Sequence, residues 1–132
     1  MRRFMKIQFY YILFVLFGLI VSCAAQNKEL PSMKASEVQT KLKTDSSLVL
    51  LDVRTPSEYD GPLGHIEGSI LIPLSDLQSR VSELDKFKER EIIVYCRSGN
   101  RSRTATRILL EHGFRAVNML GGIKAWNKLA KE

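Results

Sequence analysis

One feature of the sequence constrains the fold of this chain most. It is a short apolar run followed directly by a glycine-containing loop. The run is Ile92-Ile93-Val94-Tyr95, and the loop that follows it is Cys96-Arg97-Ser98-Gly99-Asn100-Arg101-Ser102. A continuous apolar run of this length is typical of a buried parallel strand. Residues 103–112 then have the pattern of a helix. The sequence therefore predicts a strand, a tight loop and a helix in immediate succession, with Cys96 at the end of the strand.

This succession would lower the pKa of the Cys96 thiol in three ways. Backbone N–H groups of the loop would point at the sulfur, as in an anion-binding nest. The positive end of the following helix dipole would lie beside it, and Arg97 and Arg101 add nearby cations. Gly99 suits such a cradle because glycine tolerates positive φ and close backbone approach. Since a thiol with a low pKa is nucleophilic, we expect Cys96 to be catalytic rather than a buried structural cysteine.

Apolar segments alternate with helical patterns along the rest of the chain. We expect strands at residues 48–53, 69–72, 92–95 and 116–120, and helices at residues 36–43, 55–58, 75–84, 103–112 and 123–131. The first helix would begin at a capping box of Ser36 and Gln39, and the second at one of Thr55 and Glu58. This order predicts an α/β fold, a parallel sheet flanked by helices on both faces. Asp52 and Cys96, each at a strand end, would then share one sheet edge.

Three motifs, in this order along the chain, resemble those of a single-domain rhodanese, a sulfurtransferase. They are Leu50-Leu51-Asp52-Val53-Arg54, Gly64-His65-Ile66-Glu67-Gly68-Ser69 and the loop from Cys96 to Ser102. The similarity runs from about Met33 to the C-terminus. It implies a rhodanese-like fold, in which the loop cysteine takes a sulfane sulfur from a donor as a persulfide and passes it to a nucleophilic acceptor.

The resemblance also implies roles for the residues around Cys96. The transferred sulfur and the anionic donor would be cradled by the backbone of Arg97, Ser98, Gly99, Asn100, Arg101 and Ser102. Arg97 would meet an oxyanion such as thiosulfate, because a planar guanidinium binds such anions in two places. Arg101 would either assist the anion or pair with Asp52 or Glu58 to hold the loop, and we favour the pairing. The loop would be supported by Asp52, Arg54, Glu58 and His65.

His65 is expected to form a structural hydrogen bond, because a thiolate that is already ionised needs no general base. The segment Asp60-Gly61-Pro62-Leu63 is longer than is usual in the family, which would reshape one wall of the pocket. We expect neither a cofactor nor a metal site, because two histidines and one free cysteine at unrelated positions do not provide a ligand set.

We therefore expect a sulfurtransferase that moves sulfur from a small anionic donor such as thiosulfate to a thiol or cyanide. One alternative is a binding or sulfur-relay module at a membrane, with a protein as sulfur donor or acceptor. A phosphatase or an arsenate reductase is less favoured, since the related folds with those activities use Cys-x5-Arg. Here Cys96 and Arg101 form the shorter Cys-x4-Arg.

Residues 1–22 are expected to be a signal peptide of the lipoprotein type. A basic start precedes the uncharged residues 9–21, which are fewer than the ~20 that span a bilayer. Ile20-Val21-Ser22-Cys23 resembles the lipobox of bacterial lipoproteins, so we expect Cys23 to be acylated. Residues 23–32 would form a polar tether and residues 33–132 the rhodanese-like domain, anchored to a membrane and facing the periplasm or the cell exterior. An ordinary secretory peptide and an uncleaved anchor remain alternatives.

The formal net charge of +6 overstates the basicity of the domain, because Arg2, Arg3 and Lys6 belong to the expected leader. Most other basic residues are interspersed with acidic ones. The exception is a group that comprises Arg97, Arg101, Arg103 and Arg107. Such a group attracts small anions, and the distribution does not indicate nucleic-acid binding.

Overall fold

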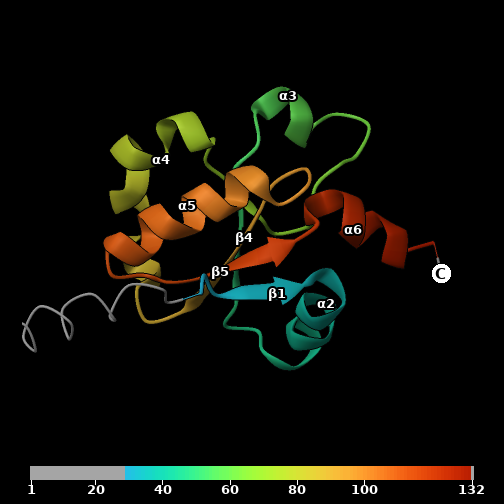
Figure 1. Ribbon diagram of the computed structural model, residues 1–132, viewed down its shortest axis with the longest axis horizontal. Coiled ribbons are helices and arrows are strands. Elements are labelled where there is room, and N and C mark those ends of the chain that lie inside the picture. Colours follow the sequence, from blue (N-terminus) through green and yellow to red (C-terminus); the bar gives the residue numbers. More distant parts are fainter. Residues whose placement is uncertain (1–28, 132) are drawn as a thin grey trace, which may run out of the picture.

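The computed structural model describes residues 29–131 (Figure 1). The elements are β1 (Ser32–Lys34), α2 (Ala35–Thr44), β2 (Val49–Asp52), α3 (Pro56–Tyr59), β3 (Ile70–Leu71), α4 (Leu74–Arg80), the 3-10 helix η1 (Val81–Phe87), β4 (Glu91–Tyr95), α5 (Asn100–Glu111), β5 (Arg115–Leu120) and α6 (Gly122–Leu129). The expected signal peptide, Cys23 and most of the tether lie outside the described residues. Within residues 29–131, no helix has the length and apolar character that crossing a membrane requires.

The five strands form one parallel sheet in the order β1-β5-β4-β2-β3. Its central strand, β4, is the predicted run, and Ile92, Ile93 and Val94 are fully buried there. A central strand covered on both faces needs such an uninterrupted apolar sequence. The predicted parallel α/β sheet is thus confirmed.

Helices cover both faces of this sheet, as predicted (Figure 1). Alternate residues of β4 point to opposite faces. Val94 packs in one core with Leu77 of α4 and Leu109 of α5. Ile93 packs in the other core with Val38 of α2, and Ile123 of α6 belongs to the same cluster. The two cores hold the sheet between the helix layers and fix the strand ends from which the site is built.

Two helix predictions were wrong in detail. The first helix begins at Ala35, and Glu37 rather than Ser36 caps it, because the Glu37 carboxylate accepts a hydrogen bond from Lys34 N–H at 2.7 Å. The helix predicted at 75–84 instead divides into α4 and η1. Val81, Leu84 and Phe87 recur every third residue and all pack on one core, which suits the three-residue turn of a 3-10 helix. The Thr55–Glu58 capping box is confirmed.

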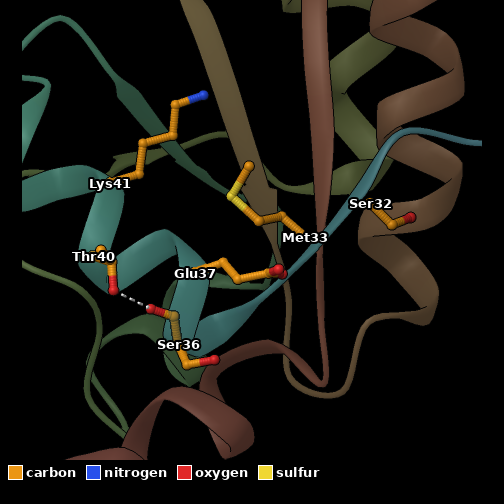
Figure 2. A pocket seen from close by; sticks show the side chains of 6 residues that line it. All are labelled: Ser32, Met33, Ser36, Glu37, Thr40 and Lys41. Atoms are coloured by element: carbon orange, nitrogen blue, oxygen red, sulfur yellow. Dashed lines mark hydrogen bonds between the residues drawn. The ribbon is translucent and has the colours of Figure 1, made fainter.

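Strand β1 was not predicted, and Ser32, which we had expected in the tether, is its first residue. This three-residue strand pairs with β5, placing Ser32 beside Asn118. A cavity of about 590 Å³ between β1 and α2 is lined by Ser32, Met33, Ser36, Glu37, Thr40 and Lys41 (Figure 2). Because β1 is the edge strand farthest from β2 in the sheet order, this cavity contains none of the predicted site residues.

Candidate active site

Strands β2 and β4 end side by side, and the site lies just beyond their ends. Asp52 and Tyr95 are register partners, and Val53 N–H donates to Tyr95 O at 3.0 Å. Cys96 follows at once. The helix after it begins at Asn100, three residues earlier than predicted, so the second half of the loop is the first turn of α5. The shared strand edge that we predicted for Asp52 and Cys96 is therefore present.

The sulfur of Cys96 accepts hydrogen bonds from its own loop. Gly99 N–H donates to Sγ at 3.1 Å and the Ser102 hydroxyl donates at 3.4 Å. Burial disfavours the charged thiolate, since Cys96 is 1% exposed. The Ser102 hydroxyl and the N–H groups of Ser102, Gly99 and Ser98 outweigh this burial and lower the pKa of the Cys96 thiol. The site thus favours a buried thiolate surrounded by donors.

Gly99 lies at the N-cap of α5 with φ of 103°, a conformation that favours glycine. A Cβ there would lie 3.2 Å from the backbone nitrogen of Gly121. Both observations agree with the tolerance of positive φ and close approach that the sequence predicted at this position. The loop therefore needs a glycine here to place its N–H groups around the sulfur.

The start of helix α6 forms backbone hydrogen bonds with the Cys96 loop, a contact that the sequence analysis did not predict. Ile123 N–H donates to Cys96 O at 2.8 Å and Lys124 N–H donates to Arg97 O at 3.2 Å. A trans peptide points its C=O and N–H in opposite directions. Holding the Arg97 carbonyl on α6 therefore turns Ser98 N–H toward the sulfur. The consecutive glycines Gly121 and Gly122, both at positive φ, were the sequence signal for this close approach.

Arg101 adopts the second of the two arrangements expected for it. Its guanidinium donates to both carboxylate oxygens of Glu58, at 2.7 and 2.6 Å. These bonds lower the pKa of Glu58 from 4.5 to about 2. Because that pKa is depressed, the stability contributed by the pair is fully present above pH 4.5 and is lost as the pH falls toward 2. The pair ties the first turn of α5 to α3.

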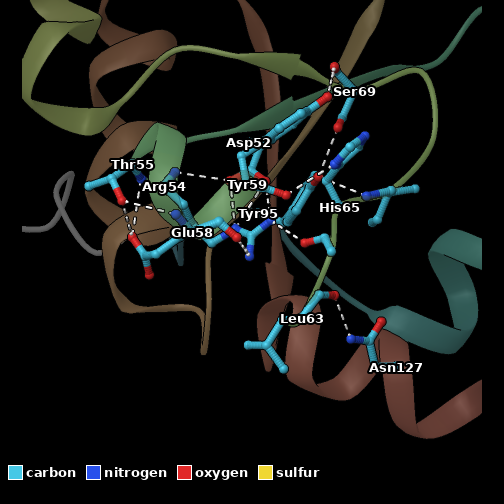
Figure 3. Close-up of polar contacts among 12 residues, drawn as sticks. Asp52, Arg54, Thr55, Glu58, Tyr59, Leu63, His65, Ser69, Tyr95 and Asn127 are labelled. Atoms are coloured by element: carbon cyan, nitrogen blue, oxygen red, sulfur yellow. Dashed lines mark hydrogen bonds and ion pairs between the residues drawn. The ribbon is translucent and has the colours of Figure 1, made fainter. Parts of the chain in front are cut away.

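Asp52 and Arg54 form a second ion pair, whose side chains are both fully buried. Arg54 Nη2 donates to Asp52 Oδ2 at 2.6 Å, and its Nε lies 3.0 Å from each carboxylate oxygen. The remaining donors reach Glu58 O at 3.1 Å and Gly64 O at 2.8 Å (Figure 3). One guanidinium thus joins the end of β2 to α3 and to the segment that follows it.

His65 is engaged with Tyr59. The two rings stack with centroids 3.7 Å apart, and His65 Nδ1 lies 3.1 Å from Tyr59 O (Figure 3). Tyr95, at the end of β4, contacts the motif at residues 64–69. Its hydroxyl donates to Ser69 Oγ at 2.9 Å and accepts from Ile66 N–H. Burial raises the pKa of Tyr95 to about 12. The geometry agrees with a supporting position for His65, and the sequence had not singled out Tyr95.

A cavity of about 380 Å³ lies beside the loop and is lined by Arg54, Ser57, Glu58, Pro62, Leu63 and Arg97. Pro62 and Leu63 come from the segment 60–63, which therefore forms one wall of this cavity. Arg97 is exposed and lines this cavity. Within residues 29–131, no cluster of three or more His, Cys, Asp or Glu is arranged to hold a metal ion.

Substituting Ser102 by alanine is expected to raise the pKa of the Cys96 thiol, because a donor to the thiolate is lost. A hydrogen bond to a charged group contributes about 1.5–3 kcal/mol, so the thiolate fraction below the pKa falls by about 10-fold or more. Thiolate absorbance at 240 nm, with a Cys96→Ala spectrum subtracted, follows this titration. Ser98→Ala is the control, because Ser98 contributes its backbone N–H. Equal titration curves for Ser102→Ala and wild type would contradict the account.

Known proteins share this sequence pattern and fold. A sulfurtransferase of Allochromatium vinosum is 34% identical over 93 residues, which cover 70% of this chain and 83% of the relative. The thiosulfate sulfurtransferase PspE of Escherichia coli is 36% identical over 74 residues, covering 56% of this chain and 69% of that protein. Some curated relatives are longer: the chain spans 51% of the putative sulfur carrier protein YrkF from Bacillus subtilis.

The fold is similar to that of solved structures as well. A rhodanese-related protein of Thermoplasma volcanium superposes with a TM-score of 0.67 at 32% identity, covering 75% of this chain and 92% of that one. The family model of the rhodanese-like domain matches residues 34–129, a span that includes the Cys96 loop, both buried ion-pair partners and all three motifs. This chain belongs to the rhodanese-like domain family.

Proposed function

We propose that this protein is a sulfurtransferase that carries sulfur on Cys96 as a persulfide, with thiosulfate as a donor and a thiol or cyanide as acceptor. The observation that carries the proposal is the set of donors around Cys96 Sγ, namely Gly99 N–H, the Ser102 hydroxyl and further loop N–H groups. They favour a thiolate before the donor arrives and can stabilise the negative sulfur of a persulfide afterwards.

The first half of the reaction is a displacement at sulfur. The Cys96 thiolate bonds to the outer sulfur of thiosulfate, the S–S bond of thiosulfate breaks, and its electron pair leaves with sulfite. In the second half, the acceptor sulfur or cyanide carbon bonds to the outer sulfur of the persulfide. The electron pair of that S–S bond then returns to Cys96 as a thiolate. The products are sulfite and either a persulfide of the acceptor or thiocyanate.

Arg97 is proposed to bind the sulfonate portion of the donor. Its side chain is exposed and lines the cavity beside the loop, whereas Arg101 is occupied by Glu58. Because Cys96 is only 1% exposed, part of its surroundings must move for the donor to reach the sulfur. No proton has to be removed from a thiol that is already ionised, so His65 is not needed as a base.

Steady-state kinetics with thiosulfate and cyanide test this function. We expect thiocyanate and sulfite in equal amounts, and parallel double-reciprocal plots, because sulfite leaves before the acceptor reacts. Hydrolysis of p-nitrophenyl phosphate, measured in parallel, is expected to be negligible, because the Cys-x4-Arg spacing makes a smaller cradle than phosphate-ester chemistry needs. Phosphate turnover comparable with sulfur transfer, or intersecting plots, would contradict the proposal.

We further propose export and membrane anchoring through acylated Cys23. The basic start, the short apolar stretch and the Ile20-Val21-Ser22-Cys23 pattern support this. Metabolic labelling with a fatty-acid analogue is expected to mark the wild-type protein and not a Cys23→Ser variant. Equal labelling of the two proteins, or none of either, would contradict it.

A further inference from the structure

A second cavity adjoins the one beside the Cys96 loop. It measures about 650 Å³ and is lined by Pro62, Leu63, Lys124, Asn127, Lys128, Ala130 and Lys131. Pro62 and Leu63 line both cavities, so the two cavities are neighbours on either side of this pair. The wall between them is held in place, because Asn127 Nδ2 donates to Leu63 O at 2.9 Å (Figure 3).

The lysines of the second cavity follow one another along the chain at increasing distance from the reactive loop. Lys124 is next to it, since its N–H donates to Arg97 O at 3.2 Å. Lys128 follows one helical turn later on the same face of α6, about 6 Å farther along the axis. Together with Arg97 of the first cavity, the lysine side chains form a path of positive charge that starts at the mouth of the site. We call Arg97, Lys124, Lys128 and Lys131 the cationic groove.

Within residues 29–131, the lysine charges of the groove are not compensated by ion pairs. The three lysines are exposed, and none forms an ion pair with another residue of the described part of the chain. Among the described residues that line the second cavity, none is acidic. A solvated helix face commonly mixes both signs, whereas residues 122–129 of α6 contain lysines and no acidic residue. A cleft lined by one sign of charge concentrates ligands of the opposite sign.

We propose that the cationic groove binds the carboxylates of the sulfur acceptor, a peptide-sized anionic thiol, while the thiol reaches Cys96. This inference rests on the proposed function. Lys128 lines only the second cavity and lies one helical turn beyond Lys124, so it extends farther from Cys96 than a small anion such as thiosulfate needs. A ligand whose carboxylates lie several bonds from its sulfur can bridge the two cavities. The length of the groove therefore indicates the acceptor rather than the donor.

Sulfur transfer from the Cys96 persulfide to this thiol conserves both atoms and electrons. The acceptor thiol releases its proton to solvent, and its sulfur bonds to the outer sulfur of the Cys96 persulfide. The S–S bond to Cys96 breaks, and its electron pair restores the thiolate in the cradle. The acceptor leaves as a persulfide. The lysines make no bond in this step and contribute by holding the carboxylates, which raises the local concentration of the thiol.

Two matched probes test the groove: glutathione, and glutathione diethyl ester, which has the same thiol but no free carboxylate. The full chain is loaded with thiosulfate, and the second-order rate of sulfur transfer to each probe is measured. In the Lys124→Gln/Lys128→Gln variant, the rate ratio of glutathione to ester is expected to fall by about 5- to 10-fold, from the loss of two solvent-exposed charge contacts. Added salt should lower the wild-type ratio in the same direction.

The control variant is Lys43→Gln/Lys86→Gln, which removes the same charge. Both lysines are exposed and precede β2 and β4, at the sheet end opposite Cys96. This variant is expected to keep the wild-type ratio. A ratio that falls equally in both variants, or in neither, would overturn the proposal. Slower loading by thiosulfate in the Lys124→Gln/Lys128→Gln variant with an unchanged ratio would also overturn it, because the lysines would then serve the donor.

Binding of S-methylglutathione, which cannot accept sulfur, separates failure of the groove from failure of the proposed function. Calorimetric titration is expected to show binding to the wild type that weakens by a similar factor in Lys124→Gln/Lys128→Gln. If no persulfide forms with thiosulfate but this difference is present, the groove stands and the thiosulfate reaction fails. If persulfide forms and the two proteins bind the probe equally, the groove proposal is wrong.

Discussion

Replacing Arg54 by methionine lowers the free energy of unfolding by about 3–5 kcal/mol, because breaking a buried ion pair leaves one charge without a partner. Asp52 and Arg54 are both fully buried, and Arg54 supplies the donors that surround the Asp52 carboxylate. The same substitution also removes the bonds to Glu58 O and Gly64 O, which leaves two carbonyls to find other donors. Urea unfolding followed by circular dichroism measures the loss.

The double variant Asp52→Asn/Arg54→Met is the control for this prediction. It removes the uncompensated carboxylate as well as the guanidinium, so part of the lost stability should return. A double-mutant cycle with Asp52→Asn then isolates the coupling between the two side chains. A loss of less than about 1 kcal/mol for Arg54→Met would mean that the pair behaves like an exposed one and would contradict the account.

Replacing Gly122 by alanine is expected to reduce kcat/KM for thiosulfate by about 10²-fold, the effect of misplacing reacting groups by about 1 Å. A Cβ at Gly122 would lie 2.3 Å from Cys96 O and 2.7 Å from the carbonyl carbon of Arg97. Both are backbone atoms of the reactive loop, so the loop itself must move. The φ of 57° adds strain for any residue with a Cβ, roughly 1–2 kcal/mol.

Gly113→Ala provides the matched control. Gly113 also has positive φ, at 81°, but a Cβ there would have no atom within 4 Å. It therefore introduces backbone strain without crowding, and we expect reduced stability with kcat/KM within about 2-fold of wild type. Similar kcat/KM values for the Gly122 and Gly113 variants would show that α6 does not position the loop. Steady-state assays below the melting temperature of each variant distinguish these results.

Local sequence was sufficient to predict the parts of the fold that depend on neighbours along the chain. The apolar run of β4 indicated a buried central strand, and Thr55 with Glu58 indicated the start of α3. The position of Cys96 directly after β4 indicated a loop whose N–H groups face its sulfur. These predictions hold because strand, cap and nest geometry are each determined within a few residues.

The remaining features depend on segments that are far apart in sequence. The choice of Glu58 rather than Asp52 as partner of Arg101 follows from where α3 lies, and Asp52 is already occupied by Arg54. Strand β1 is too short to show a hydrophobic pattern in the sequence, and it forms by pairing with β5. The contact of α6 with the Cys96 carbonyl requires knowledge of how the sheet brings the two segments together.

Hydrogen-bond donors contribute more than cations to the lowered pKa of the Cys96 thiol. The sequence analysis named loop N–H groups, the helix dipole and the cations Arg97 and Arg101 as causes, but not the Ser102 hydroxyl. In the structure the Ser102 hydroxyl and the loop N–H groups outweigh burial, and Arg101, which is paired with Glu58, makes a smaller electrostatic contribution. Ser102 was predicted only as part of the backbone cradle, because its spacing from Cys96 indicates a side-chain contact only once α5 is known to begin at Asn100.

The central claim is that Cys96 carries sulfur, and intact-mass measurement of the purified protein after incubation with thiosulfate tests it most directly. We predict a gain of the mass of one sulfur atom in the wild type that is reversed by cyanide or a thiol. The Cys96→Ala variant should show no gain. A gain in the variant, or none in the wild type with thiosulfate or any other sulfane-sulfur donor, would contradict the account.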